Sequence, residues 1–136
     1  MTKYTLETTV PRPYEETVEA VRAALAAAGF GILTEIDLKA TLKAKLDVDI
    51  APQVILGACR PELAHQALQA EPSIAALLPC NVVVRAVDDT TAVVEAFDPD
   101  AMMSLAAHDQ AGDTLRTVAT DARQRLTAAL AALENN

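Results

Sequence analysis

Tryptophan is absent from this sequence, and only four of its residues are aromatic: Tyr4, Tyr14, Phe30 and Phe97. Hydrophobic residues still make up 51% of the chain, so its core must be built from Ala, Leu, Val and Ile. A chain of 136 residues with this apolar content can bury a core without disulfides or a metal ion. Length and composition therefore predict a single domain over residues 1–136.

A long apolar run is also missing. No segment reaches the roughly 18 consecutive apolar residues that span a bilayer. Residues 1–10 alternate polar and apolar side chains, without the basic start and apolar stretch of a secretory signal. We therefore expect a cytoplasmic protein, in which Cys59 and Cys80 are reduced at rest.

Positive charge is scarce. Lys and Arg total 11 against 19 Asp and Glu, which gives a net charge of −8. No basic residue lies between Arg85 and Arg116, whereas seven acidic residues do. Nucleic acids and anionic membranes both require a basic surface, so the sequence argues against either as a partner.

Periodicity and turn residues divide the chain into strands and helices. Residues 4–10 alternate as a half-buried strand does, and a helical stripe covers 14–28 before Gly29. Further strands are predicted over residues 30–37, 54–59, 80–87 and 91–97. Further helices are predicted over 38–46, 61–70 and 100–107, with a turn at 74–77 capped by Ser73 and a closing helix over 114–133.

The order of these elements predicts the fold class. Asp88-Asp89 is a tight connection, so the strands on either side of it should form an antiparallel hairpin. We expect an α+β fold in which helices cover one face of a five-stranded, mostly antiparallel sheet and a long helix ends the chain.

Several short stretches, taken together, resemble one family. They are Leu33-Thr34-Glu35-Ile36-Asp37, Ile55-Leu56-Gly57-Ala58-Cys59-Arg60-Pro61, Leu63-Ala64, Leu78-Pro79-Cys80-Asn81-Val82-Val83-Val84, and Asp98-Pro99 followed by Met102. On these residues the chain is similar to the bacterial and archaeal family called domain of unknown function 302. The resemblance implies a curved sheet crossed by a long helix, like one repeat of the TATA-box-binding protein, and packing as a homodimer. It implies no catalytic residues. The chain has Arg60 where the family usually has Asn, and Asp47 where the family often has Gly.

Cys59 is the first candidate site residue. It ends a predicted strand beside Arg60 and just before a helix that begins at Pro61. A helix N-terminus and a guanidinium group both favour a thiolate, which could act as a nucleophile, a sulfur carrier or a metal ligand. The alternative is a small buried side chain at a crowded strand end.

Cys80 begins another predicted strand, so the two cysteines could lie together if those strand ends meet. Two close thiols can form a disulfide or bind a soft metal. A metal site would need further ligands from His65, His108, Met102 or Met103, and their spacing is poor. We therefore predict neither a bound metal nor another cofactor.

Three polar residues complete the candidate site. Glu35 and Asp37 are two apart on a strand and so point to one face, where paired carboxylates can support acid–base chemistry. The alternative is an exposed sheet edge. Asn81, next to Cys80, could bond a ligand or a partner chain, or its own backbone.

The sequence leaves three functions open. The first is a homodimeric module that binds a small molecule or partner beside Glu35, Asp37, Cys59, Arg60, Cys80 and Asn81. The second is a thiol-dependent redox or sulfur-handling role for Cys59. The third is a structural or regulatory dimer without a ligand. We favour the first, and a binding protein over an enzyme.

Overall fold

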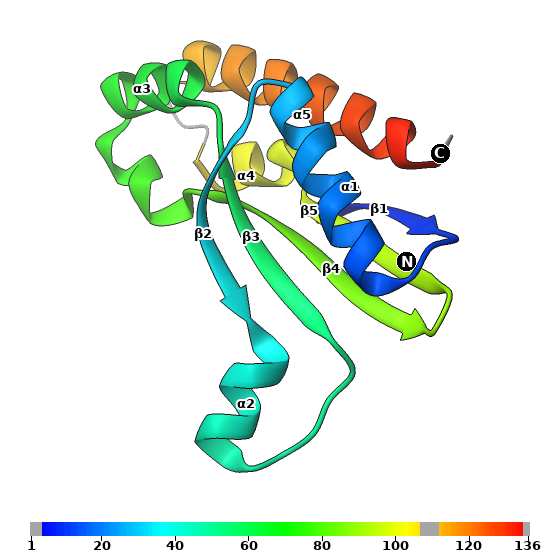
Figure 1. Ribbon diagram of the computed structural model, residues 1–136. Helices are drawn as coiled ribbons and strands as arrows, with labels where there is room; N and C mark the ends of the chain where they lie inside the picture. Colours follow the sequence, from blue (N-terminus) through cyan, green and yellow to red (C-terminus); the bar gives the residue numbers. More distant parts are fainter. Residues whose placement is uncertain (1–3, 107–111, 135–136) are drawn as a thin grey trace.

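The structure, a computed structural model, describes residues 4–106 and 112–134 (Figure 1). Its elements are β1 (Thr5–Val10), α1 (Tyr14–Ala27), β2 (Gly31–Asp37), α2 (Leu38–Leu46), β3 (Gln53–Cys59), α3 (Pro61–Ala70), the 3₁₀ helix η1 (Pro72–Leu77), β4 (Cys80–Asp88), β5 (Thr91–Phe97), α4 (Pro99–Ala106) and α5 (Gly112–Glu134). The predicted elements all appear, with ends shifted by at most two residues. One detail was wrong: the Glu71 side chain, not Ser73, caps η1, because it accepts a hydrogen bond from the Ser73 N–H.

The five strands form one antiparallel sheet in the order β1-β5-β4-β3-β2. The β4–β5 hairpin lies at its centre, and β1 and β2 form its edges. This confirms the predicted α+β class and the hairpin across Asp88-Asp89. Between β2 and β3 the register shifts after Ile32, so Leu33 is an extra residue in the edge strand.

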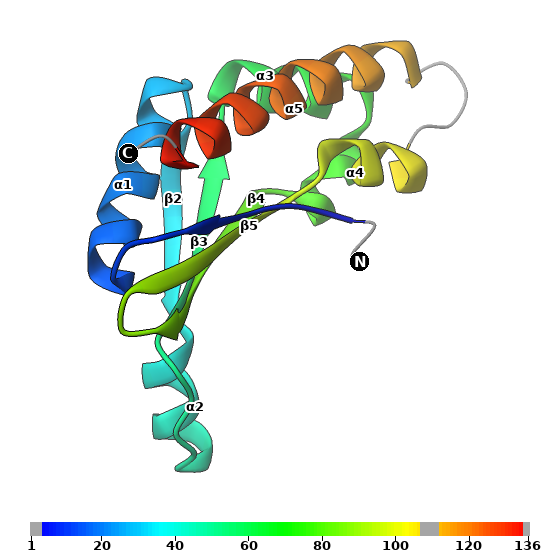
Figure 2. The same cartoon turned by 90° about the vertical axis from the view of Figure 1, so that its right-hand side faces the viewer.

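Helices α1 and α5 pack on one face of the sheet (Figure 2). Alternate residues of β3, β4 and β5, such as Leu56, Val84 and Val94, are fully buried beneath them. Val21 of α1 and Leu126 of α5 cover the core on the helix side of the sheet. As the sequence indicated, aliphatic residues and alanine fill this core, with Phe30 its one buried aromatic side chain among the described residues.

A second, smaller core lies beside the first. Ala67 of α3, Ile74 of η1 and Leu115 of α5 are buried together there, and Met102 and Met103 of α4 pack against them. The two methionines are therefore filling a hydrophobic core. None of the helices in the described parts of the chain has the length and apolar character that crossing a bilayer requires.

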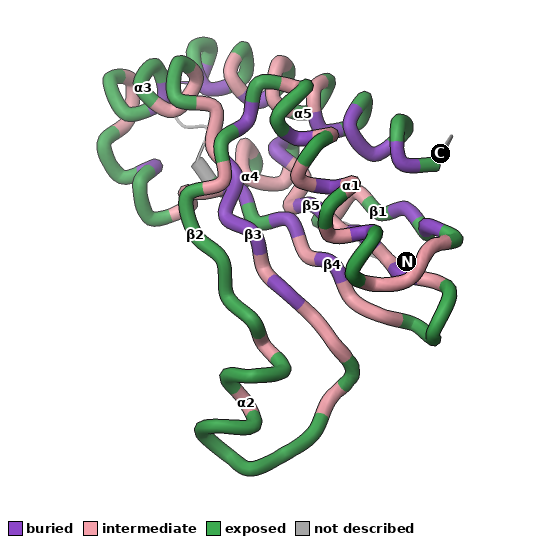
Figure 3. Tube along the Cα trace, in the orientation of Figure 1, coloured by how far each residue is buried: buried purple, intermediate pink, exposed green. Residues whose placement is uncertain are grey.

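The end of β2 and α2 project away from both cores as an arm, which we define as residues 33–50 (Figure 1). No residue of α2 is buried, and most of the arm is exposed (Figure 3). Polar contacts hold α2 in place: Asp37 caps its start, Lys39 Nζ donates to the Ile50 carbonyl oxygen, and Lys43 pairs with Asp47. Asp47 ends α2 with φ of 55°, the left-handed conformation that glycine adopts most readily.

Candidate functional site

Strand pairing brings the two cysteines to the same end of the sheet. Cys59 ends β3 and Cys80 begins the antiparallel neighbour β4, where Ala58 is the register partner of Cys80. The two thiols are therefore offset by one residue rather than directly opposite. Both cysteines are free, and both line one small hollow of about 40 Å³.

Apolar residues make up most of this hollow, which we call the cysteine-end hollow. Its lining comes from two helices, two strands and the connections next to them: Phe30, Ala58, Cys59, Arg60, Leu63, Ala64, Leu78, Cys80 and Ala122. Arg60 is the only charged residue among them. The hollow thus joins an apolar wall to one cationic side chain.

Neither thiol is poised as a thiolate. Burial raises the pKa of Cys59, and the negative charge of Glu62 raises it further. Burial, with a smaller effect of Cys59, raises the pKa of Cys80 to about 11. The expectation that Arg60 would favour a Cys59 thiolate was wrong: burial and the charge of Glu62 raise the pKa of Cys59, and Arg60 forms a 2.6 Å ion pair with Glu62.

Arg60 connects β3 to α3 as the residue before Pro61. Its side chain is only 19% exposed, and Nη1 donates to the Glu62 carboxylate. Its Nε is buried and has no hydrogen-bond partner. Arg60 therefore carries an unsatisfied donor beside the hollow.

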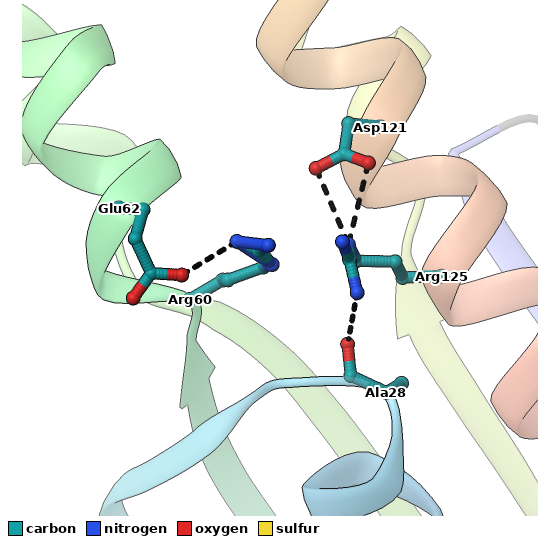
Figure 4. Close-up of polar contacts among 5 residues, drawn as sticks. All are labelled: Ala28, Arg60, Glu62, Asp121 and Arg125. Carbon is teal, nitrogen blue, oxygen red and sulfur yellow. Dashed lines mark hydrogen bonds and ion pairs between the residues drawn. The ribbon is translucent and has the colours of Figure 1, made fainter.

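A second arginine approaches Arg60 from α5 (Figure 4). Arg125 donates from Nε to Asp121 and, at 2.9 Å, from Nη1 to the Ala28 carbonyl oxygen at the end of α1. A Cβ placed on Gly29 would stand 3.3 Å from Arg60 Nε and 3.4 Å from Arg125 Nη1. Gly29 also has a φ of 94°, so both its conformation and its surroundings favour glycine.

Sequence reasoning missed Arg125, which lies 65 positions beyond Arg60. The signal was weak: an Asp-x-x-x-Arg spacing on a helix is typical of an exposed ion pair. Only the packing of α5 over the end of α1 places this side chain beside Arg60.

The two carboxylates of β2 do not join this site. Glu35 forms an ion pair with Arg22 of α1, and Asp37 caps α2 by accepting from the Ala40 N–H at 2.9 Å. Asp37 pairs in register with Val54, at the opposite end of β3 from Cys59. Each carboxylate thus has its own structural partner.

The remaining candidates are also separated. Asn81 is exposed and pairs in register with Gly57, on the face of β4 opposite Cys80. His65 is exposed on α3, and His108 lies outside the described residues. Within residues 4–106 and 112–134, no group of three or more His, Cys, Asp or Glu side chains could hold a metal ion.

A larger depression lies elsewhere, on the outer side of α5. It measures about 480 Å³ and is lined by Asp100, Thr120, Arg123, Gln124, Thr127, Ala128 and Ala131. Arg123 is its only cation; its Nε donates to Asp98 and forms an ion pair with Asp100, each at 3.2 Å. Among the described residues, no buried side-chain donor without a partner lies there, so we place the candidate site at the cysteine-end hollow.

Comparison with known proteins agrees with the fold. Residues 6–133 match the family described as domain of unknown function DUF302. A crystal structure of an uncharacterized conserved protein DUF302 from Bacillus stearothermophilus is similar to this chain, with 27% sequence identity and a TM-score of 0.83. The match covers 96% of this chain and 98% of that one. No curated protein matches the sequence.

Proposed function

The chain belongs to the family of domain of unknown function DUF302, and we propose that it acts as a homodimeric module that binds a small molecule. The binding site is the cysteine-end hollow. The observation that carries this proposal is the Arg60 Nε, a buried donor without a partner at the edge of an apolar hollow.

Buried polar atoms in native proteins nearly always have a hydrogen-bond partner. A buried polar atom that lacks one lowers the stability of the fold by about 1–3 kcal/mol. Arg60 Nε is the only such side-chain atom among the described residues. An acceptor supplied by a bound molecule would remove this cost. The orphan donor therefore favours ligand binding at this place in the fold.

The size of the hollow limits what enters it. A volume of about 40 Å³ exceeds the roughly 30 Å³ that one water occupies, so the hollow accepts a single small group. The rest of a ligand would lie over the start of α3. Leu63 and Ala64, on the first turn of α3, offer it an apolar surface.

A thiol-dependent function has less support. Nucleophilic cysteines are activated by a lowered pKa, whereas the pKa values of both thiols here are raised. In the proposed function, Cys59 and Cys80 contribute shape and a weakly polar wall.

The arm supports self-association. Four of the large apolar side chains exposed in the described structure lie on it: Leu33, Ile36, Leu46 and Val48. A helix as short as α2, with no buried residue, is marginal in water unless another surface covers it. β2 also leaves one backbone edge open, and an antiparallel edge can pair with its own copy about a two-fold axis.

The charge of the arm favours a second copy of the chain as the partner that covers it. Within the arm, residues 37–50 hold three lysines and three aspartates, so this segment is neutral on a chain of net charge −8. Two copies would repel one another least where they meet through this segment.

The dimer is tested by sedimentation of the full chain and of a variant carrying Leu46→Glu and Val48→Glu. We expect a dimer that the double variant converts to a folded monomer. Leu68→Glu and Leu105→Glu, which also alter exposed leucines but lie off the arm, should leave the dimer intact. A monomeric wild type, or a double variant that stays dimeric, contradicts the proposal.

The binding site is tested by amide chemical shifts during titration with acetamide, isopropanol, acetate and inorganic phosphate. At least one probe should shift Cys59, Arg60 and Leu63. Ala64→Leu, which fills the hollow, should abolish that response, whereas Ala75→Leu at an exposed position should preserve it. No response to any probe, or an unchanged response in Ala64→Leu, contradicts binding in the hollow.

A further inference from the structure

We infer that the bound ligand is an anion, and that Arg60 and Arg125 hold it between their guanidinium groups beside Gly29. This inference rests on the proposed function and names the chemical class of its ligand. Arg60 lines the cysteine-end hollow, whereas Gly29 and Arg125 lie next to it, so the anionic group would sit beside the hollow, on the far side of Arg60. The class is a carboxylate or a phosphate group, because both present two acceptor oxygens to a guanidinium fork.

Three elements converge to make this site. Arg60 stands at the start of α3, Arg125 in the middle of α5, and Gly29 just after α1. The nitrogen atoms Arg60 Nε and Arg125 Nη1 approach the same side of Gly29, and Figure 4 shows the two guanidinium groups turned toward each other. A Cβ on Gly29 would stand in tight contact with Arg60 Nε, at 3.3 Å, so glycine lets the two arginines approach the chain this closely.

Both arginines have N–H donors that no group in the described structure accepts. A guanidinium group carries five N–H donors. Arg60 gives Nη1 to Glu62, and Arg125 gives Nε to Asp121 and Nη1 to the Ala28 carbonyl oxygen. Arg60 Nε is buried without any acceptor. An anion between the two guanidinium groups would accept hydrogen bonds from both side chains at once.

A purely structural role accounts for Arg125 but not for Arg60. Arg125 satisfies a carbonyl oxygen left free at the end of α1, which helix ends require. The ion pair of Arg60 is with Glu62, an exposed residue two positions away, and such pairs contribute little to stability. The burial of the Arg60 side chain to 19% exposure is therefore unexplained by folding alone.

Arginines are concentrated at this place, although each also pairs with a carboxylate, Arg60 with Glu62 and Arg125 with Asp121. The chain has a net charge of −8 and only seven arginines, so most of its surface repels anions. Two of the seven meet here. The N-terminus of the ten-residue helix α3 adds a partial positive charge on the same side.

The test is a titration with inorganic phosphate, sodium acetate and the neutral isostere acetamide, at constant ionic strength, followed by the amide shifts of Gly29, Arg60 and Glu62. Phosphate, acetate or both should shift these amides in a saturable way, and acetamide should not. If phosphate binds more tightly than acetate, the ligand carries a phosphate group; if acetate binds more tightly, the ligand is a carboxylate. Arg60→Gln and Arg125→Gln should each weaken the anion by roughly tenfold or more.

Two further variants serve as controls for misfolding and for nonspecific charge effects. Arg60→Lys keeps the positive charge but loses the fork, so it should bind more weakly than wild type even if Arg60→Gln is poorly folded. Arg116→Gln alters an exposed, ion-paired arginine of the same helix α5 and should bind as wild type does. Equal weakening in Arg116→Gln would show a nonspecific charge effect and overturn the inference.

The two proposals fail differently. If acetamide or isopropanol shifts Leu63 and Ala64 while neither anion shifts Gly29, the hollow binds a neutral ligand and only the anion inference is overturned. If no probe shifts any of these amides, both proposals are overturned.

Discussion

Thr34 lies directly over Gly57 across the β2–β3 ladder, so closely that its side chain occupies the space a Cβ at position 57 would take. Pro79, just before β4, approaches the same space, with its Cγ 2.8 Å from that Cβ position. Gly57 is therefore needed for close packing of three chain segments next to the cysteines.

Gly57→Ala should lower the free energy of unfolding by about 1–3 kcal/mol, the usual cost of overpacking. Thr34→Ala, at an exposed position, should cost much less. Combining the two should recover part of the loss, because removing the Thr34 hydroxyl frees space for the new methyl group. Urea denaturation of all four proteins gives the coupling energy, and strict additivity would show that the two residues do not compete for space.

The thiols should be slow to react. Since burial raises both pKa values, Cys59 alkylation by iodoacetamide should keep accelerating above about pH 8.5, where a free cysteine is half ionised. Cys80, with a pKa of about 11, should stay unmodified in the native protein. Peptide mass spectrometry after timed alkylation separates the two, and equal rates in denaturant provide the control. A Cys59 rate that levels off below pH 7.5 would restore the thiolate hypothesis.

Glu95 should make the stability of the folded protein depend on pH in the acidic range. Although partial burial raises its pKa, hydrogen bonds from Arg85 and Thr5 outweigh this and leave the pKa lowered. A lowered folded-state pKa stabilises the protein above the ordinary glutamate value, about 4.3, and this stabilisation is lost as pH falls through the lowered pKa. In Glu95→Gln the loss of melting temperature between pH 6 and pH 3 should be smaller than in wild type. Glu134→Gln, exposed at the end of α5, serves as the control.

Asp37 should act on α2 rather than on a ligand. Asp37→Ala removes the cap and should destabilise α2 locally by about 1 kcal/mol. Hydrogen exchange of residues 38–46 should accelerate, whereas Asp37→Asn, which keeps a capping oxygen, should not change it. Glu35→Gln should also leave this exchange unchanged, because Glu35 pairs with Arg22 and not with α2. Faster exchange in Glu35→Gln would mean that the two carboxylates work together after all.

Much of the fold could be predicted from the sequence because each element carries its own local signal. Pro61 begins α3 and Gly29 follows α1, and alternation identified the half-buried strands. The extra residue at Leu33 had no such signal, because it arises from pairing across the sheet.

The site was predicted only in part, for a physical reason. Strand pairing brings Cys59 and Cys80 to one hollow, as their places at strand ends suggested. Arg60 was assigned to the thiol because they are sequence neighbours, yet its guanidinium group turns toward Glu62 and Arg125. Side-chain direction and the packing of distant helices are tertiary properties that spacing along the chain does not contain.

The connection between β2 and β3 also bears on how this fold can change. Residues 38–52 contribute no buried side chain, while the strands on either side pair over almost their whole length. Because the closure entropy of a loop rises only slowly with its length, this connection can be shortened, extended or exchanged at little cost to the sheet. In the proposed dimer, assembly and folding would thus be encoded in separate stretches of the chain, and mutations could alter one while sparing the other.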